Sequence, residues 1–270
     1  MAVVLKTLGE LELMDEANRI VHHVLAGLGE MIAPGVTTRE LDRFAERVIR
    51  QRGGVPAFLH YKGYPATLCT SINDVIVHGI PNDRTLAEGD IVGIDCGVLY
   101  KGYYGDAART FACGKVSPQA QRLLAVTQEA LELAVEQVRP KNRLQDIGSA
   151  VQRHVEKNGF SVVREFVGHG IGAALHEEPQ VPNYGPAGRG PRLAEGMVLA
   201  IEPMVNMGKP SVKVLSDGWT AVTSDGSLSA HFEHSVAVTS AGPWILTSLA
   251  SPAGTAGPGP GASPLAGHRA

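Results

Sequence analysis

Leu86-Ala87-Glu88-Gly89 leads through a short apolar run into Ile94-Asp95, and the same phrase in the second half of the chain, Leu193-Ala194-Glu195-Gly196, leads into Ile201-Glu202. Each copy therefore delivers a carboxylate at the end of a run that has the composition of a buried strand. Two related halves of this kind can bring their acidic residues together across a pseudo-two-fold axis. Because facing carboxylates repel each other, we expect a cation between them.

Helical patterns precede both copies of the phrase and support an internal duplication. Apolar residues at helical spacing predict a first helix pair, in which Thr37 and Glu40 have the spacing of a capping box, and Gly53 ends the second helix. A second pair follows, opened by Ser117-Pro118. We therefore expect one domain over 1–249 with halves of about 1–113 and 114–249. The predicted helices cover about 11–28, 37–53, 117–138 and 144–157.

Between the helix pairs lie short β-rich runs whose apolar and polar residues alternate at least in part. Lys101-Gly102 has the form of a turn that joins the first two runs into a hairpin, with Asp95 on one arm and Asp106 at the mouth of the other. Helices and strands together indicate an α/β (α+β) protein. The expected strands cover 90–100, 107–112, 197–205 and 232–239.

Composition narrows the class of protein. The 270 residues are 44% hydrophobic and 19% charged, with a net charge of -3, which is typical of a globular protein without a global basic field for nucleic acid. Three cysteines without a C-x-x-C pair favour a reducing compartment, and no apolar run is long enough for a membrane span, so we expect a cytoplasmic protein. Residues 250–270 are rich in Ala, Gly and Pro, and we expect a disordered tail.

Four acidic residues and one histidine fall at predicted strand ends or in glycine-flanked loops. Each one alone is more often a solvated or capping residue than a ligand. Two of them follow runs that look buried, however, and a buried carboxylate needs a partner to offset its desolvation. Carboxylates with one imidazole suit divalent Mn, Fe, Co or Zn, and two such ions would neutralise four carboxylates. The candidate metal ligands are Asp95, Asp106, His169, Glu202 and Glu233.

Several motifs, taken in chain order, resemble those of the type I methionine aminopeptidases, and the similarity runs from about Gly9 to Leu246. The resemblance implies a pita-bread fold, in which two pseudosymmetric halves form a curved, mainly antiparallel sheet covered by helices. The motifs are Tyr61-Lys62-Gly63-Tyr64-Pro65, Ser71-Ile72-Asn73-Asp74 with Val77-His78-Gly79-Ile80-Pro81, the spaced Asp95 and Asp106, Gly168-His169-Gly170-Ile171-Gly172 with His176-Glu177-Glu178-Pro179, Ile201-Glu202-Pro203-Met204, and Phe232-Glu233-His234.

The resemblance also implies a dinuclear hydrolase that removes the N-terminal methionine of nascent polypeptides when the second residue is small. Asp95 would chelate one ion, Asp106 and Glu233 would bridge both, and His169 and Glu202 would complete the shell of the other ion. A hydroxide shared by the ions would attack the scissile carbonyl.

By the same resemblance, His78 would lie at the scissile amide and His176 at the substrate carbonyl, while Glu202 can act as a base toward water. Tyr104 replaces a histidine that is common in the family, which leaves the surroundings of Asp106 open. Aromatic walls and a sulfur suit the thioether of methionine. The aligned candidates for the methionine pocket are Phe58, Tyr61, Tyr64, Cys69, Leu175 and Trp219.

Two other readings stay open at this point. A prolidase or proline-specific aminopeptidase shares the fold but generally carries a sizeable domain before the metal-binding half, whereas only about seventy residues precede His78 here. A non-catalytic protein that contacts nucleic acid or ribosomes would have lost ligands and gained a basic surface. We expect a monomer that associates transiently with ribosomes, with no specific nucleic acid and no membrane as partner.

Overall fold

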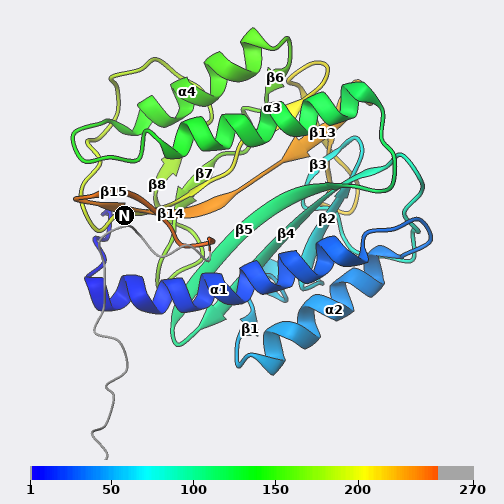
Figure 1. The fold of residues 1–270 in the computed structure, drawn as a ribbon, viewed down its shortest axis with the longest axis horizontal. Helices are drawn as coiled ribbons and strands as arrows, with labels where there is room; N and C mark the ends of the chain where they lie inside the picture. The colour runs from blue at the N-terminus through cyan, green and yellow to red at the C-terminus, as the bar shows by residue number, and fades with distance from the viewer. Residues whose placement is uncertain (1, 249–270) are drawn as a thin grey trace, which may run out of the picture.

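The computed structural model describes residues 2–248 (Figure 1), so the predicted tail over 250–270 lies outside the described residues. Two long helices belong to the first half and two to the second, as the sequence predicts. No helix in the described part is both long and apolar enough to cross a membrane. The helices are α1 (Leu8–Met31), α2 (Thr38–Gln51), the short 3₁₀ helix η1 (Tyr61–Gly63), α3 (Pro118–Val135) and α4 (Leu144–Lys157).

Fifteen strands are described, and every pairing among them is antiparallel. They are β1 (Val55–Pro56), β2 (Leu68–Ile72), β3 (Val75–Val77), β4 (Ile91–Tyr100), β5 (Tyr103–Ala112), β6 (Ser161–Val162), β7 (Gly168–Gly170), β8 (Glu177–Val181), β9 (Val198–Ile201), β10 (Met204–Asn206), β11 (Val212–Val214), β12 (Ala221–Thr223), β13 (Ser229–His231), β14 (His234–Thr239) and β15 (Gly242–Ile245).

The first half packs α1 and α2 against a sheet of order β1-β4-β2, in which β5 also pairs with β4. Helix α1 runs across β4 and β5 in Figure 1. Its buried face includes Met14, Val21 and Leu28, because apolar residues three or four positions apart share one side of a helix. The capping box predicted at the start of α2 is present: the Thr37 side chain accepts from the Glu40 N–H, and the Glu40 carboxylate accepts from the Thr37 N–H.

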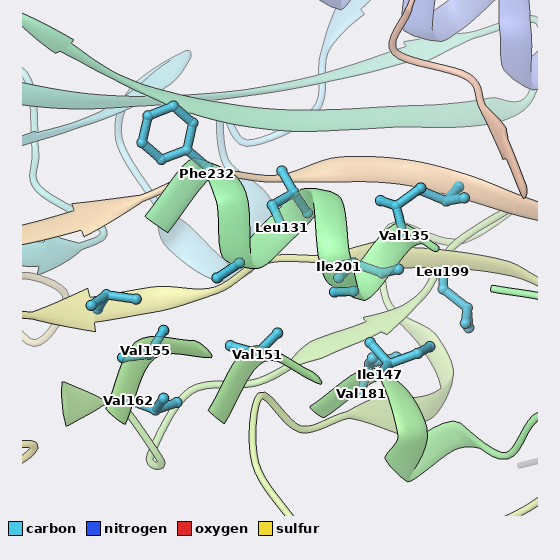
Figure 2. Close-up of a cluster of buried hydrophobic side chains, with 14 of the residues drawn as sticks. Leu131, Val135, Ile147, Val151, Val155, Val162, Val181, Leu199, Ile201 and Phe232 are labelled. Carbon is cyan, nitrogen blue, oxygen red and sulfur yellow. The ribbon is translucent and has the colours of Figure 1, made fainter. Parts of the chain in front are cut away.

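The second half packs α3 and α4 against strands that include the five-stranded sheet β15-β14-β9-β7-β8. Figure 2 shows side chains from both helices meeting those of β9 in a buried apolar layer. Leu131 on α3, Val151 on α4 and Leu199 on β9 belong to this layer. In each half the helices therefore cover one face of a sheet and leave the opposite face available for a site.

Three predicted strands have different bounds in the structure. The predicted run 107–112 begins at Tyr103 as β5, so Asp106 lies within this strand and not at its mouth. The predicted run 197–205 is split into β9 and β10 at Glu202-Pro203, because proline has no N–H to donate to a sheet. The predicted run 232–239 begins only at His234, so Glu233 lies in the gap between β13 and β14. Glu202 and Glu233 thus lie just outside strands, where the alternation of a strand does not fix the direction of the side chain.

Candidate active site

A cavity of about 240 Å³ lies between the two halves, and every site residue expected from the sequence lines it. The sequence reasoning missed five other lining residues. Three of them lie within the quoted motifs and the other two lie just before the motif that contains His169, so a place in or beside a motif was their only signal. The missed residues are Lys62, Val77, Phe166, Val167 and Met204.

Asp95 and Asp106 reach the cavity from the hairpin of β4 and β5. Asp95 is paired with Ala108, and Asp106 is paired with Gly97. Residues opposite each other in a sheet point to the same face, and so do residues two apart, which places both carboxylates on one face. The buried side chain of Asn18 on α1 accepts the Asp106 N–H at 3.2 Å and fixes this part of the hairpin.

Glu233 and His169 come from the second half. The Glu233 N–H donates to the Ala108 carbonyl of β5 at 2.8 Å, so the backbone itself joins the two halves beside the cavity. His169 lies on β7, and its Nδ1 is 2.9 Å from the Gly170 carbonyl oxygen. Because a carbonyl only accepts, Nδ1 carries the proton and Nε2 keeps a free lone pair. One ligand atom each of Asp106, His169 and Glu233 lies within 4.8 Å of the others.

Glu202 follows β9 directly and is held by its backbone, since Asn183 donates to its carbonyl oxygen at 2.9 Å. Two imidazoles flank its carboxylate: His169 Nε2 is 3.7 Å from Oε1, and His231 Nε2 is 3.5 Å from Oε2. The sequence reasoning missed His231. Its signal was its place two residues before Glu233, directly before the motif Phe232-Glu233-His234.

Each of three buried carboxylates has an oxygen that accepts no hydrogen bond from residues 2–248. Asp95 Oδ1, Asp106 Oδ1 and Glu233 Oε1 have no hydrogen-bond partner among the described residues. Burial raises the pKa of Asp95 to about 7. Burial first, and then neighbouring carboxylates, raise the pKa of Asp106 and of Glu233 well above the ordinary range. Unpartnered oxygens that converge with one imidazole lone pair are a donor set that fits divalent cations.

The two other expected catalytic histidines lie around the cavity. His78 has a left-handed backbone with φ of 61° and packs edge-on against Phe166 and Trp219, and burial lowers its pKa. His176 is exposed, and its Nδ1 is 2.9 Å from the Tyr61 hydroxyl. The loss of hydration beside the cavity, followed by the His169 imidazole, lowers the pKa of His176. Both shifts therefore favour the neutral form of the ring.

The candidate methionine pocket forms one wall of the same cavity. Tyr64 is almost fully buried, and its hydroxyl donates to the carbonyl oxygens of Leu68 and Gly79, each at 3.0 Å. Its ring meets that of Trp219 edge-on at 5.1 Å. With its hydroxyl engaged by the backbone, Tyr64 presents an apolar ring to the cavity. Phe58, Tyr61, Cys69 and Leu175 complete the wall.

Two further residues can now be placed. Tyr104 packs in the apolar cluster beside the pocket, and its N–H donates to the Gly172 carbonyl at 2.9 Å. It is not among the residues that line the cavity. Cys96, the neighbour of Asp95, points to the opposite face and is fully buried in the first-half core, as strand alternation predicts.

Known proteins share both the sequence and the fold. The model of metallopeptidase family M24 matches residues 12–240. The methionine aminopeptidase of Clostridium perfringens is 52% identical over 245 residues, which cover 91% of this chain and 98% of that protein. Methionine aminopeptidase 1 of Bacillus subtilis is 50% identical over 245 residues, which cover 91% of this chain and 99% of that protein.

Solved structures give the same picture. The crystal structure of the methionine aminopeptidase from Rickettsia prowazekii has a TM-score of 0.90 at 42% identity and covers 91% of this chain and 100% of that chain. The prolidase from Pyrococcus furiosus has a TM-score of 0.74 at 24% identity and covers 92% of this chain but only 66% of its own. The prolidase therefore shares the fold and has additional sequence beyond the shared part.

Proposed function

Because this chain belongs to metallopeptidase family M24, we propose that it removes the N-terminal methionine from nascent proteins and peptides whose second residue is small. The family resemblance and the pita-bread fold predicted from the sequence are confirmed by the matches with methionine aminopeptidases. One observation carries the proposal for this chain: unpartnered carboxylates from both halves converge beside an apolar, aromatic pocket that contains one thiol.

The residues proposed to hold the metals are Asp95, Asp106, His169, Glu202 and Glu233, with two divalent ions drawn from Co, Mn, Fe and Zn. Bound ions of this kind would polarise the scissile carbonyl and lower the pKa of water. The enclosed oxygens of Asp95, Asp106 and Glu233 support this assignment, because a buried carboxylate oxygen without a donor needs a cation.

Glu202 is proposed as the base that accepts a proton from the attacking water. Its position at a strand end, with an imidazole near each oxygen, supports this role. His176 is proposed to donate from Nε2 to the substrate carbonyl oxygen as negative charge develops there. With the Tyr61 hydroxyl donating to Nδ1, the proton of the neutral ring lies on Nε2, as this role requires. His78 is proposed to contact the scissile amide from the other side of the cavity.

Substrate choice is proposed to depend on the pocket wall. An unbranched thioether is apolar and polarisable, so it suits the rings of Tyr64 and Trp219 and the sulfur of Cys69. A large second residue would crowd the cavity and hold the carbonyl away from the attacking geometry.

Peptide hydrolysis tests the proposal. We expect Met-Ala and Met-Gly to be cleaved at least tenfold faster than Met-Leu, with activity lost on full chelation and restored by Co or Mn. The purified protein should be assayed with each metal added in turn, and metal content measured in parallel. Faster cleavage of Leu-Ala than of Met-Ala, or activity that survives exhaustive chelation, would contradict the proposal.

Transient association with ribosomes is proposed as well, and a basic cluster on the second half supports it. Two loops pair through a bridge between Arg143 and Arg192, and the Arg192 guanidinium donates to the Lys141 carbonyl at 3.4 Å. None of the ion pairs described for residues 2–248 involves a member of this cluster, so its charges are available to phosphates. The basic cluster consists of Arg139, Lys141, Arg143, Arg189 and Arg192.

Charge reversal tests this association. Arg189→Glu combined with Arg192→Glu should weaken sedimentation with ribosomes, and the loss should be greatest at low salt, while Met-Ala hydrolysis stays unchanged. Lys101→Glu, which reverses an exposed charge elsewhere on the surface, serves as the control. Equal sedimentation of all three proteins would contradict the proposal. A monomeric, cytoplasmic enzyme is proposed in addition; its three free, buried cysteines are consistent with a reducing compartment.

A further inference from the structure

The segment that precedes α1 contains a buried lysine. The Lys6 side chain is only 3% exposed, although lysine is almost never fully buried without a partner. Its ammonium donates to the Glu177 carboxylate at 2.5 Å and to the Val4 carbonyl oxygen at 3.1 Å. The Glu177 side chain is itself only 12% exposed, so solvent screens this ion pair little.

The other oxygen of the same carboxylate holds the loop 172–177. Glu177 Oε1 accepts the Ala174 N–H at 3.1 Å, while Oε2 is held by Lys6. The stem of Lys6 also packs against Gly172 so closely that a Cβ there would overlap it. One carboxylate thus ties the N-terminal segment to this loop.

The loop needs such a tie because much of it is exposed. Ala173, Ala174 and His176 are all exposed, and Leu175 is the apolar residue that anchors the loop in the pocket wall. Loops of this kind move unless packing or buried hydrogen bonds restrain them. The position of the His176 ring therefore depends on what fixes the loop on either side of it.

We propose that Lys6, acting through Glu177, is a positioning residue that sets the place of His176 at the substrate carbonyl. The inference rests on the proposed function, in which His176 donates to that oxygen. Lys6 touches neither substrate nor metal. Its effect is mechanical: without the ammonium, a largely buried carboxylate loses its counter-charge and moves toward solvent, and the loop moves with it. A shift of about 1 Å in a catalytic group can cost on the order of 100-fold in rate.

The backbone makes Lys6 a clean site for substitution. The Lys6 N–H donates to the Gly196 carbonyl at 2.7 Å independently of the side chain, so Lys6→Met should keep the N-terminal segment in place. Lys101→Met is a matched control, because it removes an ammonium that pairs with Glu16 at 2.7 Å on the exposed surface of α1. We expect Lys6→Met to lower kcat/KM for Met-Ala at least tenfold at unchanged metal content, and Lys101→Met to change it less than twofold.

Epistasis with His176 separates positioning from a general loss of stability. In a His176→Ala background the group that Lys6 positions is gone, so adding Lys6→Met should change kcat/KM less than twofold. Full additivity of the two substitutions would overturn the proposal. Lys6→Met combined with Glu177→Gln should recover much of the lost activity, because the neutral amide still accepts the Ala174 N–H and needs no counter-charge.

Hydrogen exchange of the loop amides gives a readout that does not depend on catalysis. We expect the Ala174 amide to exchange at least tenfold faster in Lys6→Met than in the wild type or in Lys101→Met. Unchanged exchange would overturn the tie between Lys6 and the loop. If the wild type fails to cleave Met-Ala at all, the proposed function fails, and with it the role assigned to His176, while the exchange experiment still decides whether Lys6 holds the loop.

Discussion

Gly89 and Gly196 close the same turn in the two copies of the Leu-Ala-Glu-Gly phrase. Both have a left-handed backbone, with φ of 93° and 87°. Both N–H groups donate to a carbonyl at the end of a neighbouring strand region, that of Cys113 at 2.9 Å and that of Val238 at 3.0 Å. The local phrase thus produces one turn twice.

The carboxylates that follow the two turns differ. Asp95 lies inside the ten-residue strand β4, whereas Glu202 lies just past the four-residue strand β9 and before a proline. Asp95 shares its surroundings with other carboxylates and its pKa is raised, while Glu202 lies between the imidazoles of His169 and His231. The same local sequence therefore places its carboxylate among other carboxylates in one half and between two imidazoles in the other, because neighbouring strands decide the environment. Both carboxylates are proposed to hold metal, and only Glu202 is proposed to accept a proton as well.

Glu202→Gln should give the largest effect. The amide keeps the shape but cannot accept a proton, so kcat for Met-Ala should fall by roughly 10²–10⁴-fold even at saturating metal. Steady-state kinetics together with measured metal content checks this. A kcat within threefold of the wild type would show that the two carboxylates do not differ in role as we propose.

Asp95→Asn should act on metal binding instead. The amide oxygen can still coordinate but carries no charge, so metal affinity should fall by at least about 10–100-fold. Mutation of residues that only hydrogen-bond to a metal ligand already has effects of this size. At saturating metal its kcat should lie closer to wild type than that of Glu202→Gln. Metal titration followed by calorimetry and by activity would measure both quantities. A larger loss of kcat in Asp95→Asn than in Glu202→Gln, at saturating metal, would contradict the difference in role between the two carboxylates.

The paired glycines offer a smaller test on stability. Gly89→Ala should cost about 1–2 kcal/mol, because its φ is unfavourable for any residue with a Cβ. Gly196→Ala should cost roughly 1–3 kcal/mol more, since its Cβ would lie 2.7 Å from the Lys6 carbonyl oxygen and overpack the site. Urea unfolding of both variants measures the difference. An equal loss of unfolding free energy in the two variants would mean that the Lys6 backbone moves aside at little cost, and would weaken the case for a rigid N-terminal segment.

The pH dependence of the metal-free protein should give the smallest shift. Asp95, Asp106 and Glu233 have a raised pKa in the folded state, so folding retains their protons and stability falls as pH rises. For Asp95 the loss is complete above its pKa of about 7, and for the other two it continues to higher pH. We expect Tm with chelator to fall by at least roughly 3 °C between pH 6.5 and 8.5.

Buried histidines set the lower limit of the pH range in which stability falls with rising pH. Burial lowers the pKa of His78, and it lowers that of His234 to about 4, so folding disfavours their protonation and stability rises with pH until their unfolded pKa near 6.5. Above that pH the carboxylates act, joined near pH 8.5 by the thiols of Cys69 and Cys96, whose pKa burial also raises. Saturation with Mn should remove the carboxylates' share of the decline, because bound cations favour the charged form. An undiminished decline with Mn would locate its source outside the metal site.

Much of the fold could be predicted because its signals are local. The helix faces, the Thr37 capping box and the hairpin at Lys101-Gly102 each depend on residues within one or two turns of chain, and the structure has all three. The short strands β7 and β8 were missed, because three to five residues give too little alternation to detect. The division at about residue 113 into pseudosymmetric halves stays a prediction.

The candidate site was predictable only in part. The motifs named every ligand candidate, and all of them line the cavity, but their roles remain proposals. His231 and Lys6 were missed, since neither lies within one of the motifs. Each meets a residue far along the chain, Glu202 in one case and Glu177 in the other.

The sequence by itself determined where the turns and helices form and which acidic residues follow buried runs, because capping, glycine φ and apolar spacing are properties of adjacent residues. Only the tertiary structure decided what each carboxylate meets. Asp95, Asp106 and Glu233 are buried around one cavity. Glu202 lies between two imidazoles, and Glu177 pairs with Lys6. Desolvation and Coulomb interaction depend on distance in space rather than along the chain, so the chemistry of each group was fixed only when the two halves packed together.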